Sequence, residues 1–154
     1  MLGTTDLEDH FATAIRLRDQ DRFEEAVTEL TELLNRSPGG EIRGAGFLVR
    51  GGIYEDHLNE PAKALSDYER AVELCPNSTI ASTSLFHCLL SFGQIERALQ
   101  EADRFNSCIP KEKRNRPGVL AYLRLRSKYK ACTEEQLNRI RDHFWKHDRL
   151  DQPP

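Results

Sequence analysis

Long apolar runs are absent from this 154-residue sequence, and no stretch approaches the roughly 18 apolar residues that a membrane helix needs. The first ten residues, MLGTTDLEDH, lack the basic and apolar regions of a secretory signal, so we expect a cytoplasmic protein without a membrane segment. Cysteine is scarce, and no two cysteines form a CxxC pair. We therefore expect buried or half-buried free thiols, not disulfides or metal ligands, at Cys75, Cys88, Cys108 and Cys132.

Catalytic motifs are also missing. There is no P-loop, no GxGxxG after a strand, no HExxH and no GxSxG. Gly51 and Gly52 fall inside a predicted helix, where close packing explains them better than phosphate binding. His143 and His147 share one helix face, but no further ligand has matching spacing. The sequence thus predicts a protein that is not an enzyme and has no cofactor or metal.

Charge is unevenly distributed along the chain, whose net charge is −3. Residues 1–75 hold 16 acids and 8 bases, whereas residues 111–154 hold 6 acids and 12 bases. The segment between them holds 3 acids and 2 bases. This asymmetry suits electrostatically steered association with a charged partner.

Three segments align without gaps, and they are Phe23–Pro38, Pro61–Pro76 and Ile95–Pro110. Each has an alanine three residues after its start (Ala26, Ala64 and Ala98) and a proline twelve residues later (Pro38, Pro76 and Pro110). Apolar residues recur at helical spacing after each alanine. A small residue lets two helices cross closely, and proline cannot continue a helix. Each segment is therefore predicted to be a helix that ends before its proline.

A second helical pattern precedes each segment, and turn residues join the two. These turns are expected at Asp19–Asp21, His57–Asn59 and Phe92–Gln94. The repeated unit is thus a helix–turn–helix hairpin, and its prolines are 38 and then 34 residues apart.

This pattern resembles the tetratricopeptide repeat (TPR), a hairpin with a small–aromatic signature and a terminal proline. The middle unit carries the resemblance best, with Phe47-x-x-x-Gly51-x-x-Tyr54 followed by Ala64, Tyr68, Ala71 and Pro76. The resemblance implies an all-α solenoid of about eight antiparallel helices in a single domain, residues 1–154. Its repeats are expected at about 7–38, 43–76 and 79–110, and a degenerate hairpin at about 115–147 would cap the stack. Thr133–Gln136 has the outline of a capping box that opens the last helix.

In such repeats the first helix of each hairpin lines a concave groove. By register, the partner-binding residues in that groove are expected to be Phe11, Ile15, Arg18, Leu48, Gly52, Glu55, Thr83, His87 and Leu90. Family members that clamp the C-terminal carboxylate of chaperones use Lys, Asn and Arg on these helices. The matching positions here are Ile15, Gly52, Thr83 and His87, which disfavours that use.

The leading hypothesis is a non-enzymatic protein–protein interaction module, an adaptor that binds a partner protein or peptide in the groove. One alternative is a bacterial immunity or antitoxin-type protein that binds and inhibits a toxin. Another is a nucleic-acid-associated module that uses the basic 111–130 region, although phosphate would be repelled by the acidic first half. That region could instead dock an acidic protein through Lys113, Arg114, Arg116, Arg124, Arg126 and Lys128.

Overall fold

The computed structural model describes residues 4–110, 112 and 133–148 of the chain. Its helices are α1 (Thr4–Asp19), α2 (Phe23–Arg36), α3 (Glu41–Asp56), α4 (Pro61–Leu74), α5 (Thr79–Ser91), α6 (Ile95–Cys108) and α8 (Glu134–Asp148). No strand occurs among the described residues, which agrees with the predicted all-α fold class. Of the eight helices expected, the one predicted before residue 130 lies outside the described residues.

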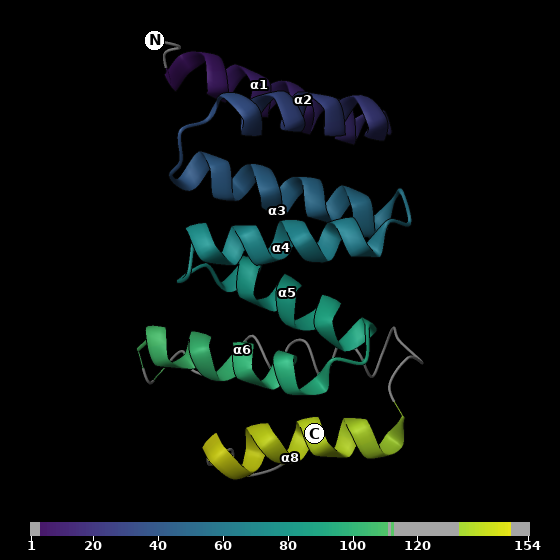
Figure 1. The fold of residues 1–154 in the computed structure, drawn as a ribbon, viewed down its shortest axis with the longest axis vertical. Coiled ribbons are helices and arrows are strands. Elements are labelled where there is room, and N and C mark those ends of the chain that lie inside the picture. Colours follow the sequence, from purple (N-terminus) through teal and green to yellow (C-terminus); the bar gives the residue numbers. More distant parts are fainter. Residues whose placement is uncertain (1–3, 111, 113–132, 149–154) are drawn as a thin grey trace. The chain divides into compact units, whose positions relative to one another are not determined.

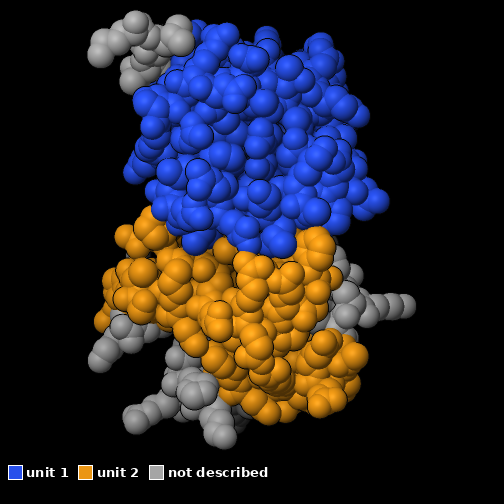
Figure 2. Space-filling view, viewed as in Figure 1, with its two compact units in different colours: residues 1–75 blue, residues 76–154 orange. Residues whose placement is uncertain are grey.

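The chain divides into two compact units, residues 1–75 and residues 76–154, which Figure 2 colours separately. Unit 1 contains α1–α4, and unit 2 contains α5, α6 and α8. In unit 1 the α1–α2 and α3–α4 turns lie at one end and the α2–α3 loop lies at the other (Figure 1). Within this unit α1 packs on α2 and α3 packs on α4, while α3 also contacts α1 and α2. The hairpins α1–α2, α3–α4 and α5–α6 confirm the three predicted helical pairs.

The repeated alanines lie where the helices pack most closely. Ala26, Ala64 and Ala98 are fully buried. The helices α2, α4 and α6 each end two residues before the repeated proline, because the residue before proline is biased away from helical geometry. The small residues and the prolines therefore have the roles that the sequence predicted.

The core of unit 1 is shared by three helices. Its buried cluster consists of Ala14 and Leu17 of α1, Ala26 and Leu30 of α2, and Ile53 of α3. Partly buried side chains, among them Phe11 and Val49, pack against this cluster. The core thus joins both hairpins of the unit, and it fixes α1 beside α3.

Each hairpin also has a carboxylate three residues after its repeated alanine. Each carboxylate contacts a polar side chain on the first helix of its own hairpin. The pairs are Glu29 with His10 (2.7 Å), Asp67 with Arg50 (2.8 Å) and Glu101 with Ser82 (2.7 Å). Asp67 and Glu101 are buried, and buried polar groups are costly unless they are hydrogen-bonded. These pairs therefore add a polar connection to the apolar packing of each hairpin.

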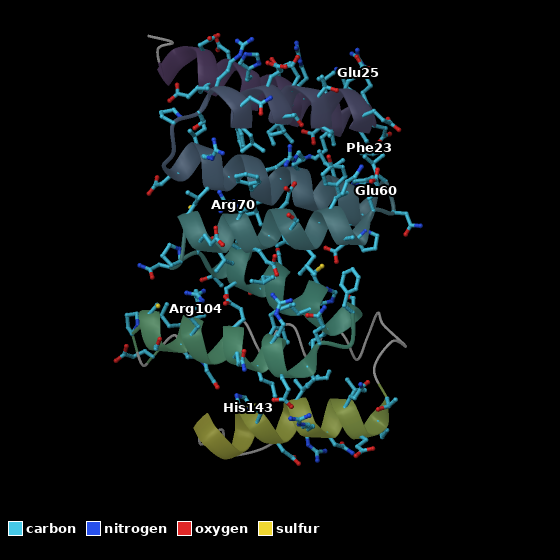
Figure 3. All side chains as sticks on the ribbon, in the orientation of Figure 1. Phe23, Glu25, Glu60, Arg70, Arg104 and His143 are labelled. Carbon is cyan, nitrogen blue, oxygen red and sulfur yellow. The ribbon has the colours of Figure 1, made fainter. Side chains whose placement is uncertain are left out.

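Helix α8 begins with the predicted capping box. The Gln136 backbone N–H donates to Thr133 Oγ1 (3.2 Å), and the Thr133 N–H donates to the Gln136 side chain (2.9 Å). Ile140 of α8 is fully buried. His143, labelled in Figure 3, lies 2.9 Å from Asp103 of α6. Helix α8 therefore packs on α6 in unit 2.

Gly51 and Gly52 should respond oppositely to substitution. A Cβ atom at Gly51 would lie 2.8 Å from the Tyr68 ring, whereas one at Gly52 would meet only the Tyr68 hydroxyl at 3.9 Å. We expect Gly51→Val to lower the free energy of unfolding by about 1–3 kcal/mol through overpacking. We expect Gly52→Ala to raise it by about 0.5–1 kcal/mol, because alanine restricts the unfolded chain more than glycine does. Urea denaturation of both variants checks this contrast, and equal effects would contradict the close packing at Gly51.

Candidate functional site

Three of the expected groove residues lie on α1. Phe11, Ile15 and Arg18 are half-buried and recur at helical spacing, so they share one side of the helix. Phe11 also packs against the core cluster of unit 1. The Arg18 guanidinium donates hydrogen bonds of 2.9 and 3.0 Å to Asp19. The part of α1 that a partner could contact is thus an apolar patch next to an ion pair.

Three further groove residues lie on α3. Leu48, Gly52 and Glu55 are half-buried and follow one another at the same helical spacing. Glu55 accepts a hydrogen bond of 2.7 Å from the Tyr68 hydroxyl of α4. Gly52 adds no side chain between Leu48 and Glu55, and a Cβ atom there would meet only the Tyr68 hydroxyl within 4 Å.

These half-buried residues lie on two helices of unit 1 that contact each other. We call this set the α1–α3 face and define it by Phe11, Ile15, Arg18, Leu48, Gly52 and Glu55.

The three groove residues expected on α5 are less accessible. His87 and Leu90 are buried, with 5% and 1% of their surface exposed, and Thr83 is half-buried. The reason is local composition, since all residues from Leu85 to Leu90 are buried and a helix that is apolar on all sides lies in the interior. On α5 only Thr83 is thus as accessible as the residues of the α1–α3 face.

A half-buried arginine connects α3 to its neighbouring helices. Arg50 donates two hydrogen bonds of 2.8 Å to Asp67 on α4 and one of 2.9 Å to Thr31 on α2. Its guanidinium lies over the rings of Phe47 and Tyr54, at 5.6 and 5.8 Å from their centroids. The hydrogen bonds to Asp67 raise the pKa of Arg50. This network joins three helices, and the sequence reasoning missed it, although the repeated acid after each alanine could have indicated it.

The described cysteines are free thiols, as expected, but one of them is not buried. Cys75 is half-buried and Cys88 is buried, whereas Cys108 is exposed because it is the last residue of α6. Desolvation raises the pKa of the Cys75 thiol. Cys132 lies outside the described residues.

The remaining sequence predictions concern metals, membranes and the basic region. Within the described residues, no three His, Cys, Asp or Glu side chains group as metal ligands would. Residues 4–110 and 133–148 contain no helix whose length and apolarity would let it span a membrane. The expected basic docking patch lies outside the described residues, and it consists of Lys113, Arg114, Arg116, Arg124, Arg126 and Lys128.

Comparison with known proteins gives similarity in structure but not in sequence. No family model and no curated protein matches the chain. A tetratricopeptide repeat protein from Parabacteroides merdae superposes with a TM-score of 0.65 at 13% identity, over 94% of this chain and 54% of that one. The chain thus spans about half the length of that protein. YrrB, described as a TPR protein with an unusual peptide-binding site, superposes with a TM-score of 0.61 at 20% identity, over 92% of this chain and 69% of its own. The predicted resemblance is therefore confirmed at the level of structure, and this chain has the tetratricopeptide-repeat fold.

Proposed function

We propose that this chain is a non-enzymatic protein-binding module that holds a segment of a partner protein on the α1–α3 face. The observation that carries this proposal is the partial exposure of Ile15 and Leu48 on two helices in contact. Aliphatic side chains that remain partly exposed on a rigid surface gain free energy when a partner covers them. Gly52 lets a bound backbone approach α3 closely, since no side chain projects there.

The fold neighbours support the same use. YrrB is described as having a peptide-binding site. Helical-repeat proteins offer extended surfaces for peptide segments, and a segment that docks there needs only a few apolar anchors. The immunity-type and nucleic-acid alternatives stay predictions, and the basic region that the second would use lies outside the described residues.

Leu48→Asp should abolish partner binding while the chain stays folded. In the complex, the introduced carboxylate would lose its hydration without gaining a group of opposite charge or a hydrogen-bond donor. We expect captured partners to fall by at least about tenfold, or ~1.4 kcal/mol, in affinity capture from the native cell extract read by quantitative mass spectrometry. Circular dichroism confirms that the variant is folded.

Leu65→Asp is the matched control, because Leu65 is also half-buried but lies on α4, which contributes no residue to the α1–α3 face as defined. Partner capture by this variant should equal that of the unmodified chain. If Leu48→Asp keeps every partner, or if both variants lose the same partners, the α1–α3 face is not the binding surface.

A further inference from the structure

The exposed side of α3 has an unusual order of residues. Glu41, Ala45, Leu48, Gly52 and Asp56 recur at intervals of three or four residues, so they form one stripe along the helix. Its two end residues, Glu41 and Asp56, are exposed carboxylates, and the residues between them are small or aliphatic. Fifteen residue steps separate these carboxylates, which corresponds to roughly 22 Å along a helix. The stripe is therefore apolar in the middle and negative at both ends.

The arginines of α3 do not neutralise this stripe. Arg43 donates hydrogen bonds to the backbone carbonyls of Leu34 and Ser37, and the Arg50 guanidinium binds Asp67 and Thr31. Both cations are thus directed toward other helices of the unit. On α1, the Arg18 charge is matched by Asp19, and the other exposed charges are Arg16, Glu8 and Asp9, which together are net negative.

Several other carboxylates of unit 1 have cationic partners. Figure 3 shows Glu25 and Glu60 at the end of the unit that holds its two turns. Arg22 donates a hydrogen bond of 2.7 Å to Glu25, and Lys63 forms an ion pair with Glu60. The described ion pairs of unit 1 do not include Glu41 or Asp56. Glu41 and Asp56 therefore place negative charge at both ends of the apolar stripe of α3, and no described ion pair compensates it.

We propose that the partner segment is basic, with aliphatic residues that cover Leu48 and Gly52 and with lysine or arginine residues that reach Glu41 and Asp56. Oppositely charged groups at the rim of an apolar contact select partners and speed their association. The same carboxylates repel nucleic-acid phosphates and acidic peptides. Because the partner's chemistry matters only if the α1–α3 face binds a protein, this proposal rests on the proposed function.

The test uses the full chain and a pair of synthetic peptides. Both peptides have leucines at the spacing of one helix face, and their remaining positions are lysine in one and glutamate in the other. We expect the lysine peptide to bind at least about tenfold more tightly at low salt, as measured by fluorescence anisotropy, and to weaken as salt rises. Tighter binding of the glutamate peptide, or equal binding of the two, would overturn the proposal.

The decisive comparison is between two charge-neutralised variants. Glu41→Gln/Asp56→Asn should weaken binding of the lysine peptide by about fivefold or more. Glu32→Gln/Glu73→Gln removes the same charge from exposed sites on α2 and α4, and it should change binding by less than about twofold. Equal losses in the two variants would mean general charge attraction and would contradict a basic partner at this stripe.

Leu48→Ala separates this proposal from the proposed function. If it weakens binding of both peptides while Glu41→Gln/Asp56→Asn has no effect, the α1–α3 face binds proteins but does not select basic ones. If it changes neither, the face itself is wrong. Analytical ultracentrifugation measures whether the chain associates with itself. Self-association that disappears in Glu41→Gln/Asp56→Asn would mean that a second copy of this chain binds the stripe, and it would overturn the assignment to another protein.

Discussion

Asp67→Ala should lower the free energy of unfolding by about 3–5 kcal/mol, the range for breaking a buried ion pair by removing one partner. Asp67 is 4% exposed, and its carboxylate accepts both hydrogen bonds from Arg50. Without it, Thr31 is the one side chain among the described residues that still accepts a hydrogen bond from the Arg50 guanidinium, which stays charged and mostly buried. Chemical denaturation with urea measures the loss.

Two controls show whether the effect comes from the orphaned charge. Replacing both partners, in Arg50→Met/Asp67→Leu, should cost far less than Asp67→Ala alone, because no charge is left buried. Glu29→Ala removes the carboxylate at the same repeat position of the first hairpin, but its side chain is 33% exposed, so we expect a loss of about 0–1 kcal/mol. A double variant as unstable as Asp67→Ala would show that packing, not charge, determines the loss.

The hairpins could be predicted from the sequence because their signals are local. Small residues such as Ala64 and Ala98 recur at a fixed distance before a proline, and each such segment is one helix. The capping box at Thr133 was predicted for the same reason, since its two hydrogen bonds join residues three apart. Where the physical cause lies within one or two helical turns, the pattern was sufficient.

Features that depend on packing between helices could not be predicted in the same way. The register alone placed His87 and Leu90 in the groove, but both are buried, as are all residues of α5 from Leu85 to Leu90. The ion pair between Arg50 and Asp67 joins residues that are 17 positions apart. The periodicity of apolar residues along one helix does not reveal which side chain of another helix an arginine will bind. Cys108 was expected to be a buried or half-buried thiol, yet it is exposed at the end of α6.

Leu30→Ala should lower the free energy of unfolding by about 2–5 kcal/mol, through lost transfer free energy and the cavity that remains. Leu30 is fully buried in the cluster that α1, α2 and α3 share. A cavity there loosens the contacts that hold α1 beside α3, so this variant should lose partner binding only to the extent that unit 1 unfolds.

Leu48→Ala supplies the opposite case, because Leu48 is half-buried on the α1–α3 face. We expect it to cost about 1 kcal/mol of stability or less, since a partly exposed side chain loses little buried area on truncation. Thermal unfolding followed by circular dichroism, paired with peptide binding well below the transition, measures both quantities for each variant. Leu30→Ala should shift the transition strongly and leave the affinity of the folded fraction unchanged, whereas Leu48→Ala should weaken binding at nearly unchanged stability. If the affinity of the folded fraction fell equally in both variants, binding would depend on the core of unit 1 as a whole, and the contact could not be assigned to the exposed side of α3.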